Sequence, residues 1–148
     1  MAEVSIPVKY VNIRLSAHAT EDTAKVERAF WNLFPDNKPT EISLNLNSTR
    51  GHYGNPITLF ETQIEDPDLI KAFIERLADN LSEPDKIALG KDSRLIIEKR
   101  NLYLRLDKQA LFNGRLKLCK ADPIRIRIHF KEKKEKVIEL CRNLGLML

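Results

Sequence analysis

The segment Ile124–Lys131 reads Ile-Arg-Ile-Arg-Ile-His-Phe-Lys, with an apolar side chain at every second position. A period of two is typical of a β-strand with one buried face and one face in water. Two shorter segments follow the same rule: Leu102–Asp107 alternates Leu with Tyr, Arg and Asp, and Arg115–Leu118 alternates Leu with Arg and Lys. These three segments predict three strands that share an aliphatic face and a cationic face.

The connection between the first two of these strands is harder to predict. Asn113-Gly114 is a typical two-residue hairpin turn, because both residues tolerate positive φ. Such a turn would place Leu111 opposite Leu116. In a continuous strand, however, Leu111 would face the opposite side from the even-numbered leucines of Leu102–Asp107. We therefore expect either a bulge between Asp107 and Ala110 or a longer loop up to Gly114.

Periodicity and capping residues predict the other elements: a strand over 9–18, a helix over 20–33 capped by Thr20 and ended by Pro35, a hairpin over 42–64, a helix over 67–81, a helix from Ser82 to about Ile97 with Gly90 as a candidate interruption, and a final helix over 132–144. This order predicts an α+β fold, an antiparallel sheet with helices packed mainly on one face. The C-terminal part is expected in helix-strand-strand-strand-helix order. We expect one domain over 1–148, in which an acidic part (1–81) and a basic part (82–148) share a core.

Charge is distributed unevenly along the chain. Residues 1–90 hold nine Lys and Arg against fourteen Asp and Glu, whereas residues 91–148 hold sixteen against seven, although the net charge is only +4. Such asymmetry is typical of proteins with a polyanion-binding surface. It favours nucleic acid as the partner.

Composition excludes several classes of protein. With 43% apolar and 31% charged residues and five Gly, the chain is expected to fold compactly. It has no apolar run of about 18 residues and no secretory signal pattern, so we expect a cytoplasmic protein without membrane contact. Cys119 and Cys141 are too far apart for a disulfide framework or a zinc site, and we expect neither a metal nor a cofactor.

The strongest candidate site is the cationic face of the three C-terminal strands. Its residues are Arg105, Arg115, Lys117, Arg125, Arg127, His129 and Lys131, with Tyr103 among them and Lys108 in the connection that follows the first strand. Guanidinium groups can pair with phosphates, and Tyr103 can stack on an unpaired base. The alternative is a solvated sheet face, which antiparallel sheets commonly present to water.

Two further groups are weaker candidates. Lys131, Lys133 and Lys134 lie at the start of the final helix, where cations oppose the helix dipole; a docked phosphate would explain them, and so would an ordinary charged helix with a Glu132–Lys136 pair. Arg50, His52 and Tyr53 belong to a loop with Gly51 and Gly54, which either binds an anion or is only a turn.

No catalytic constellation is evident. His18, His52 and His129 lie on separate predicted elements, without metal-ligand spacing. We therefore expect no enzymatic activity. A metal-independent nuclease built on His52 or His129 with a nearby Lys is kept as a less favoured alternative.

Three stretches resemble a known family. They are Ala17–Asp22, Gly51–Ile57, and Leu102–Gln109 with its continuation through Asn113-Gly114 and Asp122-Pro123-Ile124. Together they resemble an archaeal family of small RNA-binding proteins thought to be associated with the exosome, along nearly the whole chain. The resemblance implies an α+β fold like a double-stranded-RNA-binding domain or like the ribosomal protein that binds 5S rRNA. In the first case residues 84–145 would supply helix, three strands and helix.

The sequence therefore predicts a non-enzymatic RNA-binding protein, and it leaves the strandedness of the RNA open. One alternative is a protein-interaction subunit of an RNA-processing assembly that does not itself contact RNA. The oligomeric state is also open, a homodimer included.

Overall fold

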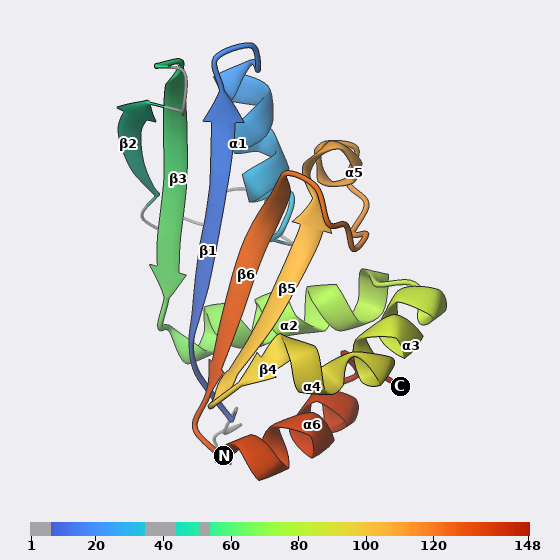
Figure 1. Ribbon diagram of the computed structural model, residues 1–148. Coiled ribbons are helices and arrows are strands. Elements are labelled where there is room, and N and C mark those ends of the chain that lie inside the picture. The colour runs from blue at the N-terminus through green and yellow to red at the C-terminus, as the bar shows by residue number, and fades with distance from the viewer. Residues whose placement is uncertain (1–6, 35–43, 51–53) are drawn as a thin grey trace.

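The fold is a six-stranded antiparallel sheet in the order β2-β3-β1-β6-β5-β4, seen in a computed structural model that describes residues 7–34, 44–50 and 54–148 (Figure 1). The strands are β1 (Val8–His18), β2 (Asn45–Arg50), β3 (Pro56–Ile64), β4 (Ile97–Glu98), β5 (Asn101–Asp107) and β6 (Pro123–Phe130). Neighbouring strands are antiparallel throughout. The predicted α+β class is confirmed.

The helices are α1 (Thr23–Trp31), α2 (Pro67–Asn80), α3 (Glu83–Lys91), α4 (Ser93–Ile96), α5 (Lys108–Phe112) and α6 (Lys134–Asn143). In Figure 1, α1 and α2 lie behind the sheet. α2 begins as predicted, because Asp66 accepts a hydrogen bond from the Asp68 backbone N–H (3.0 Å) and Pro67 suits the first turn. Ser82 caps α3 in the same way, with the Asp85 N–H as donor (3.2 Å).

The core lies between the sheet and these helices. Alternate residues of β1, such as Val11 and Ile13, are fully buried, and Ile13 is opposite Ile126 of β6. Phe30 of α1 and Phe73 of α2 close the core from the helical side without exposed surface. The acidic and basic parts of the chain therefore contribute strands to one sheet, joined where β1 pairs with β6.

Two helix boundaries differ from the predictions. Asp22, rather than Thr20, caps α1, since its carboxylate accepts a hydrogen bond from the Ala24 N–H (2.9 Å). Glu21 is consequently outside the helix. The helix after Ser82 is interrupted at Asp92 rather than at Gly90, and it resumes as the one-turn helix α4.

A two-residue turn at Asn113-Gly114 does not form. The connection is the longer of the two expected alternatives and extends to Gly114, but it contains the short helix α5 and is not simply a loop. Asp107 caps α5 by accepting a hydrogen bond from the Gln109 N–H (2.9 Å), and Gly114, at φ +78°, follows the end of that helix. This short helix resolves the parity conflict in the sequence. Residues 115–118 form only an isolated bridge between Leu106 and Leu118, so β4 supplies the third strand of the C-terminal part.

The predicted N-terminal hairpin is present as β2 and β3, which pair from Asn45 opposite Glu61 to Arg50 opposite Pro56. Residues 42–43 and 51–53 of the predicted hairpin lie outside the described residues. Within the described ranges, none of the helices has the length and apolar character that a membrane crossing requires.

Candidate nucleic-acid interface

The sheet presents one face away from α1 and α2. Its central residues are Tyr10, Asn12 and Arg14 of β1, Glu61 of β3, Asn101, Tyr103 and Arg105 of β5, and Arg125, Arg127 and His129 of β6. We call this set the open face. It follows from strand pleating, because the residues between them, such as Ile13, Leu104 and Ile126, point into the core.

Three arginines form a row across the open face. Arg105 lies directly opposite Arg125, and Arg125 lies directly opposite Arg14. All three are exposed. Like charges in such positions destabilise a sheet. Glu61 meets one end of the row, with Oε2 3.5 Å from Arg14 Nε, whereas Arg105 and Arg125 have no ion pair with any described residue.

The neighbouring row contains Asn12, Arg127 and Tyr103, again in direct register across β1, β6 and β5. The Arg127 guanidinium lies 5.6 Å from the centroid of the Tyr10 ring. Its Nε is buried and has no hydrogen-bond partner among the described residues. The Tyr103 side chain remains partly in water, with 38% of the residue exposed.

His129 contributes an acceptor rather than a positive charge. Its ring stacks on Tyr10, with centroids 4.6 Å apart, and its Nδ1 lies 2.7 Å from the Asn101 Oδ1. An amide oxygen only accepts, so Nδ1 carries the proton and Nε2 keeps its lone pair. Burial lowers the pKa of His129, and the nearby charges of Lys9, Arg100 and Arg127 lower it further. These effects all favour the neutral form of the ring.

The lysines near the final helix extend from one end of β6. Lys131 directly follows the strand, Lys133 is the residue before α6, and Lys134 is its first residue. All three are exposed. In the described part of the chain no ion pair joins Glu132 to Lys136, so the expected compensation within this helix is not formed.

Other predicted residues lie outside the strands that form the open face, although Lys117 adjoins the edge of β5, where its carbonyl oxygen accepts a hydrogen bond from the Asp107 N–H (2.8 Å). Arg115 and Lys117 are exposed in the connection between α5 and β6, because no strand forms there, and Arg50 ends β2 opposite Pro56. His52 and Tyr53 lie outside the described residues. Of the predicted set, the structure brings together Tyr103, Arg105, Arg125, Arg127 and His129 on one surface.

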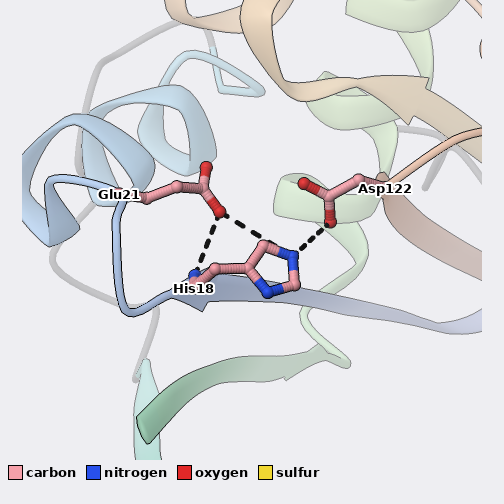
Figure 2. A group of neighbouring side chains, drawn as sticks. All are labelled: His18, Glu21 and Asp122. Carbon is pink, nitrogen blue, oxygen red and sulfur yellow. Dashed lines mark hydrogen bonds and ion pairs between the residues drawn. The ribbon is translucent and has the colours of Figure 1, made fainter. Parts of the chain in front are cut away.

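Lys108 is engaged with protein groups instead of facing solvent. Its residue is 8% exposed, and its ammonium donates to the Ser16 carbonyl oxygen (2.7 Å), to Glu21 Oε1 (3.0 Å) and to Asp122 Oδ2 (2.7 Å). His18 Nε2 lies 3.1 Å from the other Asp122 oxygen (Figure 2). Lys108 therefore connects β1 to the segment before β6, and we leave it out of the interface.

The three residues of Figure 2 have the donor types of a metal site. One ligand atom from each of His18, Glu21 and Asp122 lies within 4.8 Å of the others. The Lys108 ammonium, however, already pairs with both carboxylates. Burial raises the pKa of Asp122, but hydrogen bonds from Lys108 and His18 outweigh it and hold that pKa below its ordinary value of 3.8. Both carboxylates of the cluster therefore already have a cationic partner within the protein.

Sequence reasoning missed this cluster, and also the contribution of Arg14 and Tyr10 to the open face. Glu21 and Lys108 are 87 positions apart, and His18 and Asp122 are 104 positions apart. No local pattern joins such pairs. The alternation along β1 is enough to place Arg14 on the side away from the core, but it does not show that β6 is the neighbouring strand.

A sheet covered by helices on one side and lined with arginines on the other defines the class of this protein: a small α+β protein with an open, cationic sheet face. A family model described as RNA binding matches residues 10–130. The chain belongs to this RNA-binding family.

Individual relatives agree with that assignment. The chain is 34% identical over 139 residues to the RNA-binding protein PAB1135 of Pyrococcus abyssi, covering 90% of each chain. It is 36% identical over 144 residues to the uncharacterized protein MJ0213 of Methanocaldococcus jannaschii, covering 89% of this chain and 95% of the relative.

Solved structures of similar proteins share the fold. Protein AF2318 of Archaeglobus fulgidus superimposes with a TM-score of 0.78 at 31% identity, covering 93% of this chain and 99% of the other. Mth689, a DUF54 protein of Methanothermobacter thermautotrophicus, gives 0.77 at 25% identity over 93% and 97%. The resemblance to archaeal RNA-binding proteins is thus confirmed, whereas exosome association and the likeness to a double-stranded-RNA-binding domain stay predictions.

Proposed function

We propose that this protein binds RNA, without cleaving it, through the open face, with Arg14, Arg105 and Arg125 contacting phosphates. The observation that carries the proposal is the like-charged row, in which Arg125 lies opposite an arginine on each side. Such a row weakens the sheet, and a bound polyanion would compensate the repulsion. Membership of the RNA-binding family supports the same partner.

Arginine is suited to this task. Its planar guanidinium can donate two parallel hydrogen bonds to one phosphate, which a lysine ammonium cannot match in geometry. The exposed Lys131, Lys133 and Lys134 would extend the cationic path beyond the end of β6. Contact with the sheet face and the helix start together would let one RNA backbone run along β6.

A titration of labelled RNA at several salt concentrations tests the proposal. Each lost phosphate contact is expected to reduce the slope of log K against log salt by roughly 0.7 for single strands. Arg105→Gln and Arg125→Gln should each weaken binding and reduce this slope. Lys71→Gln is the control, because it removes one partly exposed cation from α2, on the opposite side of the sheet.

Equal losses in Lys71→Gln and Arg125→Gln would show that only net charge matters and would reject the open face. Absence of binding by the wild-type protein at low salt would reject RNA binding itself. The integrity of the RNA after incubation, read on a denaturing gel, checks that the protein does not cleave it.

The predicted association with an RNA-processing assembly is a separate proposal that rests on the family resemblance. If the association is carried by protein contacts, copurified partners should survive nuclease treatment. If it is carried by a shared RNA, the same treatment should release them.

A further inference from the structure

A cavity of about 880 Å³ adjoins the arginine row. One side is formed by the open face, including Tyr103, Arg105 and Arg125. The other side is formed by α3 and α4, including Asp92 and Leu95. These two helices lie beside β4 and β5 in Figure 1, because α4 leads directly into β4, which pairs with β5.

The two sides of the cavity carry opposite charge. The sheet side has four arginines and two carboxylates (Glu61 and Glu98), and so a net positive charge, whereas the helical side contributes Asp85 of α3 and Asp92 between α3 and α4. Asp85 accepts a hydrogen bond from the Leu118 N–H (3.1 Å), but the Asp92 carboxylate has no hydrogen bond or ion pair with any residue in the described ranges. A ligand that suits both sides must be anionic where it meets the sheet and must donate hydrogen bonds where it meets α4.

Two apolar groups also border this cavity without being covered. Leu95 is 85% exposed, the largest exposed fraction among the large hydrophobic residues that the structure describes, and Tyr103 is 38% exposed. Removing a leucine side chain from water is favourable, so its exposure beside an aromatic ring is unfavourable in the free protein. A flat, apolar ligand surface between these two side chains would remove the cost.

We infer that this cavity is a subsite for an unpaired base of single-stranded RNA. The base would stack on Tyr103 and contact Leu95, its N–H donors would face Asp92, and its phosphates would lie on the arginine row. Every base carries N–H donors on its pairing edge, and that edge is free only when the base is unpaired. Duplex RNA hides both the base faces and these edges, so it cannot satisfy the α3–α4 side.

This inference rests on the proposed function, and it deepens it by naming the form of RNA. The test compares a labelled nine-nucleotide single strand with a blunt 16-base-pair RNA duplex at the same salt concentration. Leu95→Ser removes an apolar contact, Tyr103→Leu removes the aromatic ring on which the base would stack, and Lys71→Gln again serves as the control on α2. Leu95→Ser changes an exposed residue, so it should fold even if Tyr103→Leu does not.

The single strand is expected to bind more tightly than the duplex. Base stacking on an aromatic side chain is worth about 1–3 kcal/mol, so Tyr103→Leu should weaken single-strand binding roughly 5- to 150-fold. Leu95→Ser should weaken it in the same direction. The salt slope should not change in either variant, because no phosphate contact is lost. A 2-aminopurine in the single strand should be quenched on binding, and less so in Tyr103→Leu.

Other outcomes would reject either the base subsite or the proposed function, and the two can be distinguished. Duplex binding as tight as single-strand binding, or wild-type affinity in both folded variants, would reject the base subsite while leaving RNA binding intact. A reduced salt slope in Leu95→Ser or Tyr103→Leu would also reject it, since the site would then act on phosphates. Failure to bind either RNA at low salt would instead reject the proposed function.

Discussion

Arg105 on β5 and Arg125 on β6 lie directly opposite each other in the antiparallel register, and neither has a carboxylate partner among the described residues. Two facing guanidinium groups repel, and the repulsion is present whether or not a ligand is bound. A protein selected for stability alone would place an acid at one of these positions. The Arg105–Arg125 pair is therefore expected to lower the stability of the fold while it favours the binding of a polyanion.

Replacing Arg125 by Gln should separate these two effects. We expect the free energy of unfolding to stay constant or to rise by up to about 1 kcal/mol, because the repulsion from both neighbouring arginines is relieved. RNA affinity should fall in the same variant. Urea denaturation and RNA titration measure the two quantities. A loss of stability together with a loss of affinity would show that Arg125 acts through folding.

Lys108→Met should have the opposite profile. The substitution leaves Glu21 and Asp122 without their buried cation, and we expect a loss of about 1–4 kcal/mol, between the values for exposed and buried pairs because both acids are partly exposed. RNA affinity of the folded protein should not change. Lys71→Met, at an exposed pair on α2, should shift stability by less than about 0.5 kcal/mol. Weakened RNA binding at unchanged stability would return Lys108 to the interface.

Asp122 should make part of the stability depend on acid pH. Its folded-state pKa lies below the ordinary value of 3.8, so the unfolded state binds its proton more readily. The stabilisation is therefore complete above the unfolded-state pKa and is lost as pH falls through the folded-state pKa. Asp122→Asn removes the titration yet suits the positive φ of 44°.

The stability difference between the wild-type protein and Asp122→Asn is thus expected to shrink as the pH falls from about 5 to below 3. Denaturant unfolding at a series of pH values measures it. A difference that stays constant over this range would mean that Asp122 contributes through its shape or backbone and not through its charge.

Two glycines should respond differently to the same pair of substitutions. A Cβ on Gly90 would overlap the Leu148 carbonyl oxygen, whereas a Cβ on Gly114 meets no atom within 4 Å but is strained at φ +78°. Gly90→Ala and Gly114→Ala should both destabilise, by about 1–3 kcal/mol. Asn tolerates positive φ, so Gly114→Asn should recover most of the stability, and Gly90→Asn should not. Thermal unfolding of the four variants decides this.

Much of the sheet could be predicted from the sequence because alternation along a strand is a local signal. The segment Ile124–Lys131 predicted both a strand and its cationic face, and β6 confirms the strand. The helix α5 escaped prediction because five residues are too few to show helical periodicity. Asp107 was the available signal, since an aspartate after a strand is also a typical helix cap.

The candidate site could be predicted only in part, for a physical reason. Alternation tells which side of a strand a residue faces, but not which strand lies beside it. The arginine row depends on the pairing of β1 with β6, which brings Arg14 next to Arg125. The Lys108 cluster likewise depends on contacts between distant segments. Without those contacts, the sequence does not distinguish a buried, ion-paired lysine from an exposed one.

The same pairing constrains how the protein is made. β1 lies in the middle of the sheet, yet Val11 pairs with Ile128, 117 positions later in the sequence. On the ribosome, β1 can pair with β3 early, but its second edge has to wait until β6 has been synthesised. During that interval an exposed strand edge is open to pairing with other chains. Slow translation of the second half should therefore increase aggregation of the nascent protein, and chaperones that cover strand edges should relieve it.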